Sequence, residues 1–467
     1  MIYNLKNLGN KKNFIVYVSL IPISIWLAIF ASDLIYQPFI WDDLHFFRNY
    51  TLGELKSTWT GNWDPDNIET PSYRPVAVIY YHTLYTVFGE NTFFLRIFIF
   101  LKAFLLLFII NSFLNFLNFK KEEILIFSFL ITFSKIFTTL IAWFTISLLL
   151  TVYIFSIISI YFFIKSIDEK KISFYLLSFF LAFLAIFMRE ELYVLPAILI
   201  LIFFLKNKIS LKNFFKCFVN IIPYLILVFL HMFLRKYFVP EAEHFEINNF
   251  TIFFGDNPLG FGGLIKSIKS SFLPMGYLSS HYSDLNQVYF ASAWIILILT
   301  SLFLICLKFK FDSKNLKKIY ILFFLIFCCS LPHITIARSF GIFLPTVFAL
   351  LIISILINLV FSMSFNFKFF RYFAVLIFAI GITGGIYRSN LHVKSMNVFA
   401  KDIVFYDSQF IYGYKEEGKV ISIPQKRYQN KKLHLQNLNI DSFDTNPERI
   451  FSSSTKIRKS KYHPLWF

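Results

Sequence analysis

Residues 341–362 read GIFLPTVFALLIISILINLVFS, a stretch without a single charged side chain. A helix needs about 20 consecutive apolar residues to cross a bilayer, because the hydrocarbon core is ~30 Å thick and every backbone amide inside it must be paired within the helix. This stretch meets both requirements. Similar stretches recur along the chain, so the sequence predicts a membrane protein built from helices.

The composition supports the same conclusion. Of the 467 residues, 57% are hydrophobic and only 15% are charged, whereas about 25% of the residues of a soluble domain are charged. A water-soluble globular enzyme is therefore excluded. In a soluble protein the formal charge of +18 would suggest a nucleic-acid partner. Here the basic residues lie mainly in short loops between apolar stretches, so we interpret them as topology signals and expect no nucleic acid.

Windows of membrane length predict about eleven transmembrane helices, which makes the expected fold class an all-α polytopic membrane protein with a large first outer loop. The predicted helices lie near residues 14–32, 93–117, 123–142, 145–165, 173–188, 192–206, 217–238, 288–307, 319–336, 341–362 and 369–387. We expect a transmembrane domain over residues 1–388, followed by a polar tail or small appendage over residues 389–467.

The basic loops indicate the orientation of these helices. Clusters of Lys and Arg fall on one side of the predicted bundle, and they occupy residues 120–121, 165–171, 206–216, 308–318 and 368–371. The positive-inside bias makes that side cytoplasmic, together with the N-terminus. Loops 33–92 and 239–287 and the tail then lie outside. The first apolar run has no small-residue cleavage site, so we expect a retained helix and a multi-pass protein of a bacterial inner membrane.

The first outer loop is rich in acid. It begins with the run FIWDDLHFFRN at residues 39–49, in which Asp42 and Asp43 are adjacent. Because the two charges repel each other, one carboxyl holds its proton more tightly and the other can accept a proton from an incoming hydroxyl. The pair therefore suits a general base. The alternative is that the two residues cap the next helix or face water.

Arg74 ends the same loop. It lies between Tyr73 and Pro75, and the apolar stretch that follows ends at Gly89, which is typical of a helix with proline at its start and glycine after its end. A guanidinium at this place could bind a phosphate through two parallel hydrogen bonds. The alternative is an ion pair with one of the acids of the loop.

A second charged cluster separates two apolar stretches on the predicted outer side. Arg189, Glu190 and Glu191 follow one another there, ahead of the run YVLP at residues 193–196. Charges this close to a membrane are costly and usually face a cavity or a partner. A plain hairpin turn between two helices remains the alternative.

Isolated basic residues offer further candidates for contact with an anionic lipid head group. Lys102 lies inside the second predicted helix, and Arg338 lies near His333 at an outer helix end. Snorkelling, or pairing with an acid, is the alternative for both. The acids and His244 within residues 241–246 lack the helical spacing of metal ligands, so we predict no metal site there and leave the question of a divalent metal open.

In their order along the chain these features resemble the GT-C superfamily of membrane glycosyltransferases, and most closely the transmembrane O-mannosyltransferases that carry TPR repeats and their bacterial relatives. Three local matches over roughly the first 200 residues support the resemblance: the FIWDD run, the Tyr73-Arg74-Pro75 motif, and the Arg189-Glu190 pair before VLP, where the family often has Lys-Glu. Where the family has His and Asn in its second helix, this chain has Lys102 and Phe98. The TPR array is absent.

The resemblance implies an inverting transfer of a sugar from a polyprenyl-phosphate donor to a hydroxyl of a glycan, lipid or protein acceptor at the outer face, with membrane lipid around it. It implies no cofactor, because a phosphate leaving group needs cationic stabilisation but not a metal. The implied site comprises Asp43 or Asp42 as the proton acceptor and Tyr73, Arg74, Lys102, Glu190 and Arg338 as substrate contacts. The rival hypotheses are a transporter or flippase of lipid-linked saccharides, and a polymerase or ligase of surface glycans.

Overall fold

The computed structural model describes residues 11–35, 37, 43, 46–64, 72–89, 91–240, 264, 267–274, 285–308, 313–333, 341–362 and 368–416. Over these ranges the regular structure is helical throughout, with no strand. Six of the described helices are long and apolar enough to cross a membrane, and a bent pair makes a possible seventh. The expectation of an all-α, multi-pass membrane protein is thereby confirmed.

Every predicted apolar segment corresponds to a helix. The helices are α1 (Lys11–Leu34), α5 (Thr92–Phe116), the pair α6 (Lys121–Thr132) and α7 (Lys135–Ala142), α8 (Leu148–Glu169), α9 (Ile172–Met188), α10 (Leu195–Lys206), α11 (Leu211–Phe238), α14 (Leu285–Lys308), α15 (Ser313–Ser330), α16 (Phe343–Ser362) and α17 (Lys368–Glu416). The count of about eleven spans is not confirmed. For example, α10 has only 12 residues, or ~18 Å of helix.

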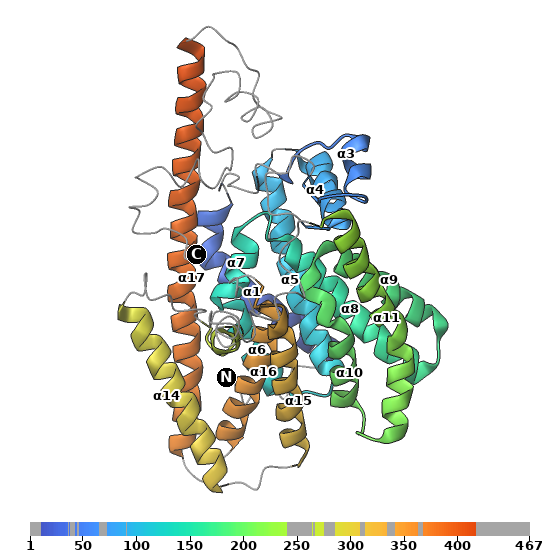
Figure 1. Cartoon of the computed structure of the whole chain (residues 1–467). Coiled ribbons are helices and arrows are strands. Elements are labelled where there is room, and N and C mark those ends of the chain that lie inside the picture. The colour runs from blue at the N-terminus through green and yellow to red at the C-terminus, as the bar shows by residue number, and fades with distance from the viewer. Residues whose placement is uncertain are drawn as a thin grey trace, which may run out of the picture.

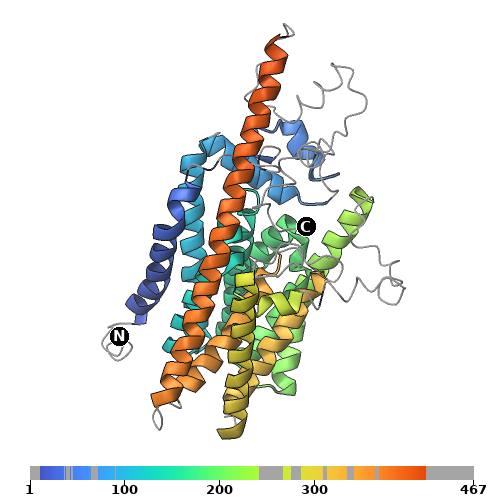
Figure 2. The ribbon, with the colours of Figure 1, turned by 90° about the vertical axis from the view of Figure 1, so that its left-hand side faces the viewer.

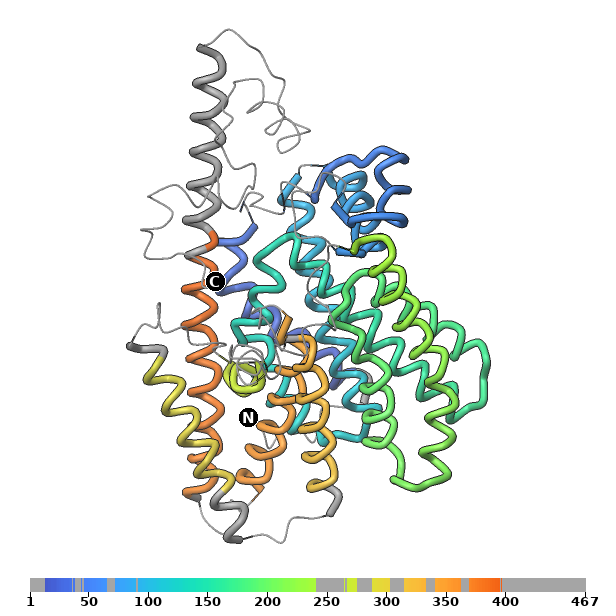
Figure 3. The backbone as a smooth tube through the Cα atoms, viewed as in Figure 1, coloured from blue at the N-terminus to red at the C-terminus, as the bar shows by residue number. Residues whose placement is uncertain are grey.

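The core of the bundle lies around α16, which is buried along almost its whole length. A helix that is apolar on all sides is stable only in an interior, where each face meets another helix. Accordingly α16 packs against α6, α14, α15 and α17, while α8 packs against α5 and α9 on the other side of the bundle. Figures 1 and 3 show these two groups of helices side by side.

The segment predicted as one helix over residues 123–142 is broken. Its two halves, α6 and α7, meet at an angle of 55°. Ser134 caps the second half by accepting a hydrogen bond from the Phe137 amide at 3.2 Å, and the Lys135 amide donates to the Pro274 carbonyl at 2.9 Å. These bonds satisfy amides that a continuous helix would have paired internally, so the break is stable inside the bundle.

The long helix α17 runs along one flank of the bundle and contacts α1, α7 and α14 (Figure 2). Gly381 and Gly385 allow its close approach. A side chain at Gly381 would meet the Trp294 ring at 2.3 Å, and one at Gly385 would meet the Phe133 carbonyl oxygen at the same distance. The helix predicted to end near residue 387 continues to Glu416, so the predicted end is wrong. No proline interrupts the sequence between these two residues. The expected domain boundary after residue 388 falls inside this helix.

Two short helices, α3 (Leu52–Ser57) and α4 (Pro75–Phe88), cover one end of the bundle (Figure 1). The prediction for α4 is confirmed: Pro75 begins the helix and Gly89 ends it with a φ of 57°. A positive φ of this kind is tolerated by glycine and strained for other residues.

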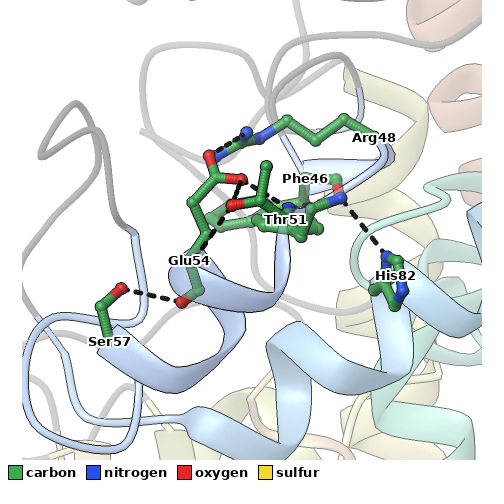
Figure 4. Close-up of polar contacts among 7 residues, drawn as sticks. Phe46, Arg48, Thr51, Glu54, Ser57 and His82 are labelled. Carbon is green, nitrogen blue, oxygen red and sulfur yellow. Dashed lines mark hydrogen bonds and ion pairs between the residues drawn. The ribbon is translucent and has the colours of Figure 1, made fainter.

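The segment between α1 and α4 is fastened to α4 by the contacts in Figure 4. Thr51 and Glu54 form a reciprocal capping box at the start of α3, and Arg48 pairs with Glu54 at 2.9 Å. The Tyr50 amide donates to Nδ1 of His82 on α4 at 3.3 Å. Burial alone would raise the pKa of Glu54, but the hydrogen bonds from Thr51 and Arg48 lower it to about 2. Glu54 therefore stays charged and keeps the loop in place.

Candidate active site

A turn at residues 143–147 joins α7 to α8 and gathers several of the predicted site residues. Asp43 is buried beside it. Its Oδ1 accepts hydrogen bonds from the Thr145 amide at 2.6 Å and from the Thr145 hydroxyl at 2.5 Å. The Tyr81 hydroxyl donates to the Thr145 carbonyl at 3.0 Å. Thr145 therefore connects the acidic start of the segment between α1 and α4 with α4 itself.

Arg96 lies next to Asp43 and was not predicted as a site residue. Its Nη1 donates to the carbonyls of Ile141 and Ala142, the latter at 3.2 Å, and its guanidinium lies 3.8 Å from the centre of the Phe144 ring. A cation at the carbonyl end of α7 is favourable because these last carbonyls have no partner inside the helix. Asp43 attracts Arg96 electrostatically. The sequence did indicate Arg96 in one way, because it is a charged residue inside an apolar helix, as Lys102 is.

Arg74 and Glu190, predicted from separate motifs, form an ion pair. Nε of Arg74 donates to Oε2 of Glu190 at 2.6 Å, and the side chains are only 14% and 7% exposed. The guanidinium also lies 4.6 Å from the centre of the Trp63 ring. Burial alone would raise the pKa of Glu190, but the neighbouring cations, Arg74 foremost, lower it to about 2. Arg74 thus forms an ion pair, which was the alternative to phosphate binding. Its partner comes from the second charged cluster and not from the loop.

More polar side chains surround this pair. The Tyr193 hydroxyl lies 2.6 Å from Nδ1 of His231, and the Tyr73 ring packs on the same imidazole at 5.3 Å between centres. Arg235, one turn further along α11, attracts Glu190. His231 and Arg235 were not predicted. They lie in a long apolar helix, where His-x-x-x-Arg places both on one face, and that spacing was the signal available in the sequence.

Tyr73 has a positioning role in the structure. Its hydroxyl donates to the Trp59 carbonyl at 3.0 Å, and its ring stacks on Phe238 at the end of α11, 5.9 Å away. These contacts hold the residue before Arg74 against α11. They account for the direction in which the chain enters α4.

Aromatic contacts link the two halves of the site. The Phe46 ring lies 4.2 Å from the Trp63 ring and 5.3 Å from the Tyr81 ring, measured between centres. Trp63 lies beneath Arg74, and Tyr81 donates to Thr145 beside Asp43. Asp43 and the Arg74–Glu190 pair therefore belong to one connected cluster at the end of the bundle covered by α3 and α4.

Lys102 reaches the same turn from α5. Its ammonium donates to the Tyr80 hydroxyl, to the Ser147 carbonyl at 3.1 Å and to the Ser147 hydroxyl at 3.4 Å. All these acceptors are neutral. Lys102 thus brings a basic group to the site, but it could bind a phosphate only by giving up one of these bonds.

Asp42 and Arg338 lie outside the described residues, as do residues 241–246. Among the residues that the structure describes, no group of three or more His, Cys, Asp and Glu side chains is arranged to hold a metal ion.

An apolar cavity of about 40 Å³ lies inside the bundle between α5, α8, α10, α15 and α16. Its wall includes Leu192 and Leu195, which closely follow Glu190 in the chain, and it extends to Leu205 at the other end of α10. Hydrocarbon is the kind of ligand that such a lining favours.

No protein-family model, curated protein or solved structure matches this chain.

Proposed function

We propose that the chain is an integral membrane glycosyltransferase that moves a sugar from a polyprenyl-phosphate donor to an acceptor hydroxyl on the extracytoplasmic face. In this reaction the acceptor oxygen attacks the anomeric carbon with inversion. The bond from that carbon to the phosphate oxygen breaks, polyprenyl phosphate leaves, and the hydroxyl proton passes to a carboxylate.

The observation that carries the proposal is the convergence of three distant stretches of chain. Asp43 of the first outer loop, Arg74 before α4 and Glu190 after α9 meet in one cluster through Thr145, Tyr81 and Trp63. A glycosyl transfer of this type needs a carboxylate for the proton, a cation for the leaving phosphate and a polar group for the sugar. The cluster contains all three chemical types.

The contacts suggest how these roles are divided. Thr145 holds Asp43 in place through Oδ1, and the Asp43 carboxylate would receive the proton, unless the adjacent Asp42 receives it. Arg74 uses only Nε for Glu190, and no described residue accepts a hydrogen bond from its two terminal nitrogens. These nitrogens form the parallel pair of donors that binds two oxygens of one phosphate.

The apolar cavity supports the choice of a lipid-linked donor. It begins close to Glu190 and continues along α10. A polyprenyl chain is larger than this cavity, so the lining helices would have to move apart to admit it, and each methylene group buried there would contribute roughly 0.8 kcal/mol.

A flippase for the same lipid-linked saccharide is the second candidate. The complete burial of Asp43 and the two hydrogen bonds to its Oδ1 favour it, because a flippase needs the cations and the lipid cavity but no proton acceptor.

The test uses the full-length protein reconstituted in lipid vesicles with a panel of radiolabelled polyprenyl-phosphate sugars and acceptor saccharides. Wild type is expected to transfer sugar from one of these donors. Asp43→Asn combined with Asp42→Asn should reduce transfer at least a hundredfold and leave binding of the donor unchanged, because only the proton acceptor is lost. Binding and transfer are measured on the same preparation.

Asp168→Asn serves as the matched control, since Asp168 pairs with Lys206 far from the cluster. It should transfer sugar at the wild-type rate. Undiminished transfer in the double aspartate variant would exclude the proposed proton acceptor. Movement of donor across the vesicle membrane without any transfer would support the flippase instead.

A further inference from the structure

Three basic residues meet at the break between α6 and α7. Lys135 is the first residue of α7, while Arg388 and His392 lie one turn apart on α17 and therefore share a face of that helix. None of the three belongs to the cluster around Asp43 and Arg74.

Two contacts align α17 with the break. The position of a Cβ at Gly385 is 2.3 Å from the Phe133 carbonyl oxygen, and the Thr138 hydroxyl donates to the Ser389 hydroxyl at 3.0 Å. Residues 385–389 of α17 thus run beside residues 133–138, in the same direction. Lys135 and Arg388 both lie within these paired stretches, and they repel each other electrostatically.

All three side chains are buried: Lys135 is 2% exposed, Arg388 3% and His392 6%. No described residue accepts a hydrogen bond from the Lys135 ammonium or the Arg388 guanidinium, and Nε of Arg388 is buried without a partner. Lys135 and Arg388 both repel a positive charge on His392. In the described part of the chain, no carboxylate compensates Lys135 or Arg388.

Two basic groups without an acidic partner are costly to bury in their charged form inside a membrane protein, because burial removes water that would solvate the charges. Such a group is usually found with an anion or at a ligand site. The N-terminal end of α7 adds a partial positive charge to the same place. The arrangement therefore attracts negative charge.

We propose that Lys135, Arg388 and His392 form a binding site for an anion of the phosphate class. A phosphate offers several acceptor oxygens and up to two negative charges, which matches a guanidinium, an ammonium and an imidazole at close quarters. The proposal does not depend on sugar transfer, because the site would hold phosphate in a transferase, a flippase or any other membrane protein.

The depth of the site admits two sources of this phosphate. Arg388 lies roughly 20 residues along α17 from Lys368, or about 30 Å, which is close to the thickness of the hydrocarbon core. A lipid phosphate and inorganic phosphate share this chemistry, and the experiment distinguishes the two.

The experiment measures the thermal unfolding of the purified full-length protein. One arm adds inorganic phosphate to protein in phosphate-free detergent, and the other compares nanodiscs of phosphatidylcholine with nanodiscs that also contain phosphatidic acid. Wild type is expected to gain stability in at least one arm. Lys135→Met and Arg388→Met should each weaken that response by roughly tenfold or more in ligand concentration, as for the loss of a hydrogen bond to a charged group.

Arg371→Met is the control, because Arg371 lies on the exposed face of the same helix, and it should respond like wild type. A response to phosphatidic acid alone would identify a lipid phosphate, and a response to inorganic phosphate would identify the free anion. Without ligand, the Met variants should be at least as stable as wild type, since each removes a buried charge that lacks a counter-ion. The proposal is overturned if neither arm stabilises wild type, or if the Met variants unfold earlier than wild type without ligand.

Discussion

The buried ion pair between Arg74 and Glu190 makes each charge dependent on the other. Removing one partner of such a pair leaves a buried charge without compensation, whereas removing both leaves neutral groups that are much cheaper to bury. Arg189 and Arg235 also act on Glu190. The loss of Glu190 should therefore be more harmful than the loss of Arg74, because it leaves several cations together.

We expect Glu190→Gln to lower the free energy of unfolding by about 3–5 kcal/mol, as is typical for breaking a buried pair. Arg74→Gln should cost less. The double variant should be more stable than the sum of the two losses predicts, which a double-mutant cycle from denaturant or thermal unfolding measures.

Glu169→Gln provides the control, because Glu169 pairs with Lys165 and Lys171 on the surface, and we expect no measurable change. Additive losses in Arg74→Gln and Glu190→Gln would show that the two side chains do not interact.

The sequence predicted Arg74 and Glu190 individually, through their motifs, but not their pairing. The two residues are 116 positions apart, so their contact depends on how α4, α9 and α11 pack. The role of Thr145 could not be predicted from the sequence, because one of its contacts with Asp43 is made by a backbone amide, which almost any residue would provide. Local patterns reveal which residues are unusual and not which of them meet.

At the scale of elements, the apolar windows predicted the helices well because a membrane demands long apolar runs with internally paired backbone. They did not predict the break before α7. Ser134, which caps α7, is also a common residue inside membrane helices, so it does not by itself indicate a break. The break also depends on distant parts of the chain, namely the Pro274 carbonyl, which accepts from the Lys135 amide, and α17. The apolar windows also ended α17 too early, because the sequence after residue 387 is more polar and still forms a helix.

Gly385→Ala tests the contact between α17 and the break. The added methyl would overlap a backbone oxygen that cannot move aside, so we expect destabilisation of about 1–3 kcal/mol or more. Thermal unfolding in detergent measures the change.

Gly53→Ala is the matched substitution, because the nearest atom to the new methyl is 3.8 Å away on the exposed helix α3. Alanine there should be neutral or stabilising by roughly 0.5–1 kcal/mol. Equal stability of the two variants would mean that α17 and the break are further apart than described.

At the scale of the whole molecule, α3, α4 and the Asp43 cluster occupy one end of the bundle, while the basic loop after α10 lies at the other. The positive-inside bias predicts that the second end is cytoplasmic. Ser57 on α3 and Lys208 in that loop are both exposed and mark the two ends.

We expect Ser57→Cys to react in intact cells with a maleimide that cannot cross membranes, and Lys208→Cys to react only after the cells are permeabilised. Mass spectrometry of the labelled protein measures both, with wild type as the control for the natural cysteines. Labelling of Lys208→Cys in intact cells would reverse the orientation and place the Asp43 cluster in the cytoplasm.

The glycine contact between α17 and residue 133 also bears on motion. Two helices separated by long side chains can slide, because those side chains change rotamer easily, but a backbone that rests on another backbone has no such freedom. The broken segment and the middle of α17 should consequently shift as a rigid body. Any hinge that opens the bundle to a large substrate must then lie at interfaces where bulkier side chains intervene.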